Sequence, residues 1–232
     1  MTALSVVQAV CPFIGVDVPG AVFSSTTREH VELKAVANDV ADMIAKAHPW
    51  QLLTTLKTHT GDGTTEDFDL PTDYDWMPDV NQVWTSDNNQ PLCKVTDVDA
   101  WLGQIVRDFD PVPGNWIIYG GQLHIRAALG SGITAKYFYQ SNLYVDPASG
   151  SNTSTFALDT DTFRLSERLL KLGIIYRWKQ LKSQPYAQEM EDYEILKEKL
   201  IARDKGATIL KQGTMRMPKG ATLAYPGNVP TS

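Results

Sequence analysis

The hydrophobic residues of this 232-residue chain follow a helical period near both ends but not between them. From Leu33 to Ala47, and again over residues 162–205, they recur at steps of three and four, which is typical of a helix with a buried face. Residues 51–161 instead contain short runs of strand-forming residues separated by turn signals. The pattern predicts helices on both sides of a small, mostly antiparallel β-domain.

The N-terminal block is expected to hold two helices. Thr26 and Glu29 have the spacing of a capping box, in which the hydroxyl of the first and the carboxylate of the second each accept a backbone N–H. A helix over about residues 27–48 follows, and Pro49 ends it because the residue before a proline is pushed out of helical conformation. The first 14 residues allow a shorter helix that Pro12 closes.

The middle segment is predicted to contain three hairpins, one helix and a last strand. Its first hairpin turns at Gly61-Asp62-Gly63, which joins a strand over 56–60 to one over 68–70. The other elements are a hairpin over 81–96, a helix from a capping pair at Thr96 and Asp99 to Phe109, a hairpin over 115–127 and a strand over 133–139. Hairpin geometry explains the glycines in these turns without any ligand.

The C-terminal helices differ in how much of their surface is apolar. Residues 162–184 are apolar on more than one face, so this helix should be buried on several sides, by its own domain or by neighbours. Pro185 interrupts it, and residues 186–205 form an amphipathic helix with one face in water. Residues 206–232 have no period, and we interpret them as an extended arm that orders on a partner. The competing interpretation is a frayed terminus without a role.

The formal net charge of −6 conceals a polarity along the chain. Residues 51–161 carry 5 basic and 15 acidic residues, residues 162–205 carry 10 and 7, and residues 206–232 carry 3 and none. The acidic middle, at −10, and the basic C-terminal third, at +6, are complementary surfaces of the kind that meet between subunits.

No motif for catalysis, a phosphate-binding loop or a metal occurs in the sequence. The acidic residues of the middle resemble a charged surface rather than the paired carboxylates of a glycosidase. The histidines share no spacing, and they are His30, His48, His59 and His124. We therefore expect a protein that is not an enzyme and that needs no cofactor or metal.

The cysteines and the apolar runs indicate the compartment. Cys11 and Cys93 are 82 positions apart with no second ligand at zinc spacing, so we expect reduced, buried residues rather than a disulfide or a zinc site. No apolar run is long enough to span a membrane, and the N-terminus lacks the basic region of a signal peptide. The protein is expected to be made and used in the cytoplasm, or in something assembled there.

Aromatic residues in the acidic middle leave one alternative function open. They are Trp76, Trp84, Trp101, Trp116, Tyr119, Tyr137 and Tyr139. Acidic surroundings disfavour stacking on nucleic acid, and the core of a small β-domain explains the residues as well. The competing function is a monomeric carbohydrate-binding or carbohydrate-cleaving module with a concave aromatic patch.

Two motifs in the middle segment carry a family resemblance. The first is FDLPTDYDWM at residues 68–77, and the second is NWIIYGGQLHIRAALGSGITAKYFYQ at residues 115–140, where a Gly-Gly hairpin precedes a strand with Tyr-Phe-Tyr. Together with the flanking helices, they resemble the adaptor proteins of tailed bacteriophages, the head-completion or head-to-tail connector ring below the portal. The resemblance covers about residues 25–205, and the strongly acidic insertion departs from it.

The resemblance implies an α+β fold and a structural role in the virion. A helical bundle body, from residues 1–50 and 162–205, would carry the β-rich insertion at 51–161 and the extended arm at 206–232. The protein would form a ring, of twelve copies by resemblance, between the portal protein and a tail or nozzle protein at the virion neck. Genome DNA would pass through the ring without specific binding. The nearest alternative is another neck or tail structural protein.

Contacts with the portal or with a neighbouring subunit are predicted for basic and apolar residues near the C-terminus. A ring would also supply the neighbours that the apolar helix over 162–184 requires. The predicted contact residues are Arg164, Arg168, Lys171, Arg177, Lys179, Lys182, Lys211, Met215, Arg216, Met217, Lys219 and Tyr225. If the acidic middle lines the channel, like charge lets DNA slide without binding.

Overall fold

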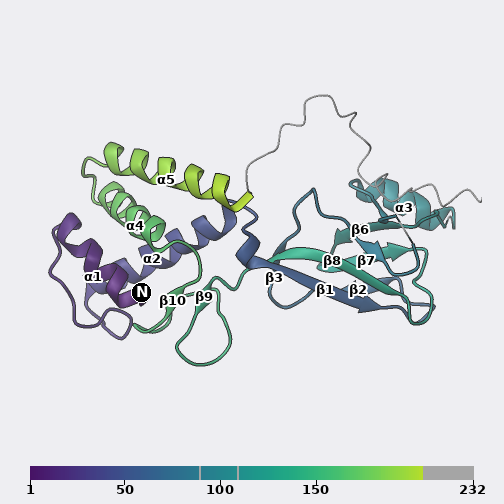
Figure 1. Ribbon diagram of the computed structural model, residues 1–232, viewed down its shortest axis with the longest axis horizontal. Helices are drawn as coiled ribbons and strands as arrows, with labels where there is room; N and C mark the ends of the chain where they lie inside the picture. The colour runs from purple at the N-terminus through teal and green to yellow at the C-terminus, as the bar shows by residue number, and fades with distance from the viewer. Residues whose placement is uncertain (89, 109, 206–232) are drawn as a thin grey trace, which may run out of the picture. The chain divides into compact units, whose positions relative to one another are not determined.

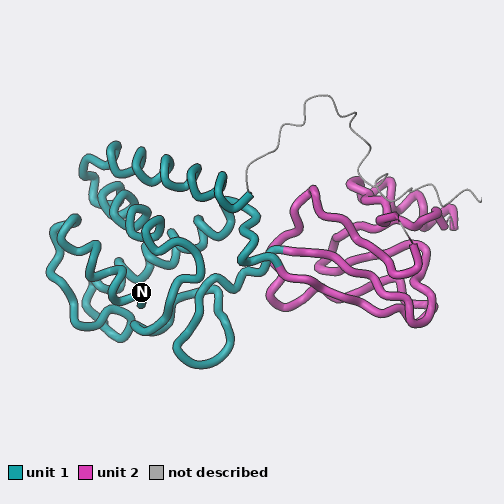
Figure 2. The backbone as a smooth tube through the Cα atoms, viewed as in Figure 1, with its two compact units in different colours: residues 1–54, 140–208 teal, residues 55–139, 209–232 magenta. Residues whose placement is uncertain are grey.

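The computed structural model describes residues 1–88, 90–108 and 110–205, which form two compact units (Figures 1 and 2). Unit 1 contains residues 1–54 and the described residues from 140 onward, and unit 2 contains residues 55–139. The described residues form both helices and mostly antiparallel sheets, so the mixed α+β class is confirmed. The predicted arm, at 206–232, lies outside the described residues.

Unit 1 is built on four helices: α1 (Ala3–Ile14), α2 (Arg28–Lys46), α4 (Glu167–Leu181) and α5 (Ala187–Lys205). A short 3-10 helix, η1 (Gln51–Leu53), follows α2. Figure 1 shows α4 between α5 and the two N-terminal helices. The side chains of α4 that are buried there include Leu169, Ile174 and Trp178. Helices of the same chain thus cover α4, so its apolar faces are no argument for a ring, contrary to the sequence-based expectation.

The ends of the N-terminal helices differ from the predicted ones. Pro12 lies inside α1, which ends only at Gly15, where a left-handed backbone (φ 70°) lets the cap N–H bond to the carbonyl of Cys11. The predicted capping box is wrong, because the N-cap of α2 is Thr27 and its side chain makes no capping bond. The hydroxyl of Ser25 instead accepts from the backbone N–H of Thr27 at 3.3 Å.

Residues 140–161, which the sequence assigned to the insertion, belong to unit 1. The buried ring of Phe156 joins the helical core, and its backbone N–H donates to Oδ1 of Asn38 on α2 at 2.7 Å. Two short strands, β9 (Val145–Asp146) and β10 (Thr162–Phe163), pair antiparallel in this region. Because β10 uses the start of the predicted helix, α4 begins at Glu167, where the hydroxyl of Ser166 caps it.

Unit 2 contains two four-stranded sheets and one helix, α3 (Val98–Val106). The first sheet consists of β1 (Thr54–Thr60), β8 (Thr134–Ser141), β3 (Tyr74–Trp76) and β4 (Trp84–Thr85). The second has the order β2 (Asp67–Asp69), β7 (Gln122–Arg126), β6 (Asn115–Tyr119) and β5 (Cys93–Lys94). Buried side chains of both sheets form the core of this unit, among them Trp116, Leu123, Ile125 and Tyr137.

The predicted hairpins of the middle segment have different outcomes. The hairpin over 115–127 is confirmed by the antiparallel pairing of β6 with β7. The hairpin around Gly61 is wrong, because β1 pairs with β8 whereas β2 pairs with β7 in the other sheet. Gly61 joins the two sheets and donates to the carbonyl of Ile133 at 2.8 Å. A Cβ at this position would meet Leu129 Cβ at 2.4 Å, which explains why glycine stands here.

The remaining elements of unit 2 are close to the predicted ones. The segment at 81–96 bends back as expected, with an antiparallel bridge between Trp84 and Pro91, but β5 then pairs parallel with β6. The helix predicted from Thr96 begins at Val98, with Asp97 as its N-cap. Its carboxylate accepts from the backbone N–H of Asp99 at 3.0 Å.

Candidate assembly surface

Four of the basic residues predicted to make intersubunit contacts hold unit 1 together. Arg177 pairs with Asp39 of α2 at 3.2 Å, Lys182 pairs with Glu32 of the same helix, and Lys179 pairs with Glu189 of α5. Side-chain hydrogen bonds also anchor Arg164, whose Nη2 donates to the carbonyl of Leu52 at 3.1 Å and whose Nη1 donates to that of Leu143. These four basic side chains therefore stabilise the packing within unit 1.

The remaining predicted contact residues are placed differently. Lys171 is half-buried, with Nζ 3.6 Å from Sδ of Met1. Arg168 is exposed and, within the described part of the chain, has no ion pair or side-chain hydrogen bond. The other six lie outside the described residues, and they are Lys211, Met215, Arg216, Met217, Lys219 and Tyr225.

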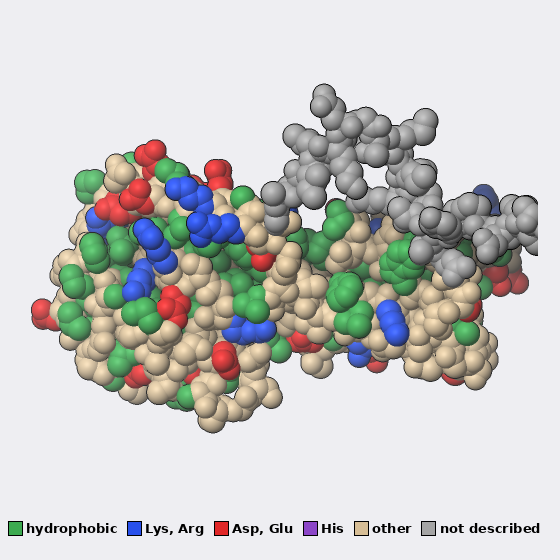
Figure 3. Space-filling model, in the orientation of Figure 1, with side chains coloured by type: hydrophobic (Ala, Val, Ile, Leu, Met, Phe, Trp, Pro, Cys, Tyr) green, Lys and Arg blue, Asp and Glu red, His purple; other side chains and the backbone are tan. Residues whose placement is uncertain are grey.

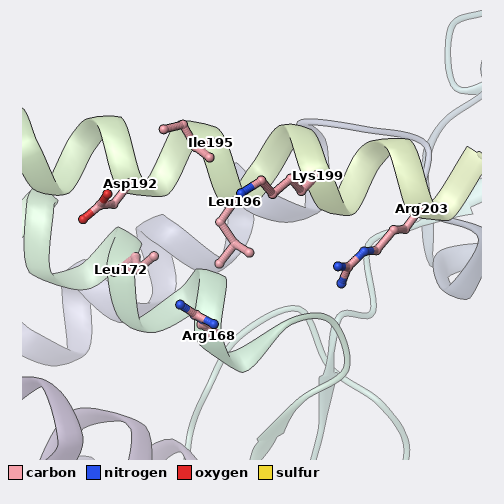
Figure 4. A pocket seen from close by; sticks show the side chains of 7 residues that line it. All are labelled: Arg168, Leu172, Asp192, Ile195, Leu196, Lys199 and Arg203. Carbon is pink, nitrogen blue, oxygen red and sulfur yellow. The ribbon is translucent and has the colours of Figure 1, made fainter.

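A groove of about 400 Å³ lies between α4 and α5, beside Arg168 (Figure 4). It is lined by Arg168, Leu172, Asp192, Ile195, Leu196, Lys199 and Arg203. In Figure 4, Asp192 and Leu172 lie at one end, and Lys199 and Arg203 point in from the other half of α5. The lining combines an apolar centre with three cations and one carboxylate. Lys and Arg side chains are also visible over α4 and α5 in Figure 3.

Sequence analysis did not identify this groove. Four of the five lining residues of α5 recur at steps of three and four, so their shared helix face was visible in the sequence; they are Asp192, Leu196, Lys199 and Arg203, and the fifth is Ile195. The mixture of charges hid that face, although the apolar stripe predicted for this helix, at Met190, Tyr193, Leu196 and Leu200, includes Leu196 of the groove. Tyr193, a member of the predicted stripe, is buried, whereas Met190 is 45% exposed.

A second unpartnered surface lies on α3 of unit 2. Val98, Leu102 and Ile105 have helical spacing in the sequence, which predicts the helix. In the structure this helix buries Trp101, whereas Val98, Leu102 and Val106 are 55%, 52% and 76% exposed. A helix of nine residues thus presents an apolar stripe to the surface of its unit, next to the acidic residues at its start.

The histidines and carboxylates do not assemble a reactive centre in the described part of the chain. His124 Nδ1 lies 2.5 Å from Oδ1 of Asp67, but its Nε2 lies 3.3 Å from the carbonyl of Tyr119, with no nucleophile beside it. Burial lowers the pKa of His48 and of His59. Among the described residues, no group of three or more His, Cys, Asp or Glu side chains is placed to hold a metal ion.

The aromatic residues of the middle segment mostly fill the core of unit 2. Trp101, Trp116, Tyr137 and Tyr139 are buried, and a buried ring cannot stack on a sugar. The desolvation of Tyr137 raises its pKa strongly, as expected for a phenol in a core. None of the described helices combines the length and the hydropathy that a membrane span requires.

Comparison with protein families gives one result that covers nearly the whole chain. The model of the SU10 adaptor protein family matches residues 1–218. A search of curated proteins yields no match. The matched range includes both units and all residues of the α4–α5 groove and of α3.

Proposed function

We propose, from the premise that this chain belongs to the SU10 adaptor protein family, that it joins the portal to the tail at the neck of a tailed-phage virion. The match over residues 1–218 carries the proposal. In this role the protein is a structural component that binds other head and tail proteins, and its activity is assembly rather than catalysis. Assembly would take place in the host cytoplasm.

The assembled form that we propose is a closed ring, of twelve copies by resemblance to other adaptors. Rings are made by one contact between two different surfaces of the subunit, repeated until it closes. Residues 55–139 of unit 2 carry 12 acidic and 5 basic side chains. Residues 162–205 carry an excess of basic side chains. This opposition supports association between copies.

Among the basic residues proposed to contact the portal or a neighbouring subunit, only some are available for such a contact. Arg168 is exposed and without an ionic partner in the described residues, and Lys171 lies at the same end of α4. Arg177, Lys179 and Lys182 are already paired with carboxylates of unit 1, so we propose that they support assembly indirectly, by stabilising the packing of that unit. The predicted arm residues remain candidates for the portal or for a tail or nozzle protein.

The acidic insertion is proposed to face or line the channel through which the genome passes. Phosphate contacts dominate the affinity of proteins for DNA, so an acidic wall repels the duplex and lets it slide. The assembled ring should therefore show no measurable affinity for duplex DNA at about 0.15 M salt. Tight binding under those conditions would contradict this part of the proposal.

The experiment that tests the proposal is sizing of the purified full chain, alone and after mixing with the purified portal protein. An adaptor forms a ring-sized complex when the portal is present. A chain that stays monomeric beside the portal but binds a tail protein would be another neck or tail component. A monomer that binds neither, but binds a polysaccharide, would support the carbohydrate module instead.

A further inference from the structure

Helix α3, whose apolar stripe consists of Val98, Leu102, Ile105 and Val106, has acidic side chains at its start and a basic side chain at its end. Asp97 and Asp99 are exposed at the start of the helix, and Arg107 is exposed at its end. The carboxylates that follow, Asp108 and Asp110, lie 3.0 Å and 3.3 Å from the guanidinium of Arg126. Asp108 and Asp110 therefore have a partner, and the carboxylate of Asp97 caps α3, whereas Asp99 and Arg107 have no ion pair among the described residues.

The α4–α5 groove has the same order of charge along α5, acidic first and basic last, so a helix with that order complements it only when it lies antiparallel. Asp192 stands at one end, and Lys199 and Arg203 stand toward the other (Figure 4). Within the part of the chain that the structure describes, none of these three side chains has an ion pair, and neither does Arg168 beside them. Leu172, Ile195 and Leu196 provide the apolar surface between the charged ends.

The two surfaces also agree in length. At 1.5 Å per residue, Asp99 and Arg107 are about 12 Å apart along α3, and Asp192 and Lys199 are about 10.5 Å apart along α5. If α3 lay antiparallel to α5 with its apolar stripe in the groove, Asp99 would approach Lys199, whereas in a parallel orientation it would approach Asp192. Arg107 follows Leu102 by five residues, so it lies on another face of the helix and does not contribute to this pairing. The parallel orientation would bring like charges together, which is unfavourable.

We propose that α3 of one copy docks antiparallel to α5 in the α4–α5 groove of a neighbouring copy. The contact is of the helix-in-groove type, in which apolar anchors at helical spacing enter a hydrophobic groove and charges at its ends set the orientation. Because the helix and the groove belong to different units of the chain, the contact is between unlike surfaces, which is the kind of contact from which rings are built. This inference rests on the proposed function in one respect, namely that copies of the chain bind one another.

Charge favours a second copy over other occupants of the groove. The sequence from 206 to 232 carries three basic residues and no acidic one, so it does not complement a groove with three cations. A DNA backbone bound there would contact the apolar centre and the carboxylate of Asp192 as well as the cations, and both contacts are unfavourable for a phosphate. An apolar helix with an acidic start, as in α3, complements both the apolar centre of the groove and its cations.

The test is cysteine crosslinking between two differently marked full-length chains, mixed at high concentration. Both carry Cys93→Ser, because Cys93 is the exposed native thiol, whereas Cys11 is buried. One chain then carries Leu102→Cys on α3, and the other carries Ile195→Cys in the groove. A disulfide between the two chains is expected. The matched control replaces the groove chain with Leu158→Cys, whose side chain is 56% exposed in unit 1 but lies outside the groove.

Charge reversal tests the orientation in the same assay. Asp99→Lys on the α3 chain should lower the yield of the mixed disulfide about fivefold, the factor that corresponds to about 1 kcal/mol for an exposed ion pair. Lys199→Glu on the groove chain should restore the yield when combined with Asp99→Lys. All six substituted side chains are at the surface or line the groove, so folding, checked by circular dichroism, should persist.

The outcomes separate this inference from the proposed function. Equal yields from the Ile195→Cys and Leu158→Cys chains would overturn the docking, as would failure of the charge reversal to rescue. A link formed only within a single chain that carries both Leu102→Cys and Ile195→Cys would also overturn it. If rings form on the portal without the mixed disulfide, only the docking is wrong. If the mixed disulfide forms but no ring binds the portal, the proposed function is wrong.

Discussion

Replacement of Gly173 by alanine should destabilise unit 1, although alanine is the better helix former. Gly173 lies in the middle of α4, and a Cβ there would stand 2.4 Å from Cγ1 of Val40 and 3.2 Å from Cε2 of Tyr193. Both neighbours are buried, Val40 on α2 and Tyr193 on α5, so neither can move away without disturbing a helix. The glycine thus permits the close approach of three helices.

The size of the effect follows from two opposing contributions. Overpacking of a well-packed core costs about 1–3 kcal/mol. Alanine in place of glycine in a helix contributes about 1 kcal/mol in the stabilising direction. Gly173→Ala should therefore lower the free energy of unfolding of unit 1 by up to about 2 kcal/mol, and Gly173→Val should lower it further.

The matched control is Gly103→Ala on α3, where a new Cβ would have no heavy atom within 4 Å. That substitution should stabilise unit 2 by about 0.5–1 kcal/mol, since only the helical preference changes. Urea unfolding followed by far-UV circular dichroism, with the two units fitted as separate transitions, measures both changes. If Gly173→Ala stabilised the protein as Gly103→Ala does, α4 would not pack against α2 and α5 as described.

Three further perturbations test other contacts. Asp161→Ala removes the carboxylate that accepts from the backbone N–H groups of Ala157 and Leu158 at 2.7 Å and 2.8 Å. It should lower the free energy of unfolding of unit 1, measured in urea, by about 1–3 kcal/mol. An unchanged unfolding midpoint would refute this. Burial, and next the charge of Lys205, lowers the pKa of His48, so the unfolded chain binds a proton there more readily than the folded one. Unit 1 should lose stability as the pH falls through about 6.5, less so in His48→Gln, as thermal unfolding at several pH values will show. Arg126→Met leaves Asp108 and Asp110 without their partner and should lower the unfolding midpoint of unit 2 but not of unit 1.

Local periodicity allowed the helices to be predicted, because their side-chain spacing is a property of consecutive residues. The helix predicted over about 27–48 is found at Arg28–Lys46, and the one over 186–205 at Ala187–Lys205. Helix starts were less predictable, since Thr26 and Thr27 offer the same hydroxyl in adjacent positions. Strand partners could not be predicted for β1 and β2, because their pairing with β8 and β7 depends on contacts distant in sequence.

The predicted contacts with the portal or a neighbouring subunit stay a prediction, although the structure shows what several of those residues contact within unit 1. The sequence located an excess of basic side chains after residue 161, and Arg168 does line the groove. It could not show that Arg177, Lys179 and Lys182 find carboxylates on neighbouring helices, since those partners come from α2 and from α5. The helical spacing of Val98, Leu102 and Ile105 predicted the helix but not the exposure of these residues, because which face of α3 is buried depends on the tertiary structure.

Electron microscopy of the portal mixed with the full chain tests the central claim most directly. The account predicts portals that carry one closed ring of this protein at the tail-facing end, with α3 of each subunit seated beside α4 and α5 of the next. Bare portals in the presence of excess folded protein would contradict the claim that this chain is the adaptor.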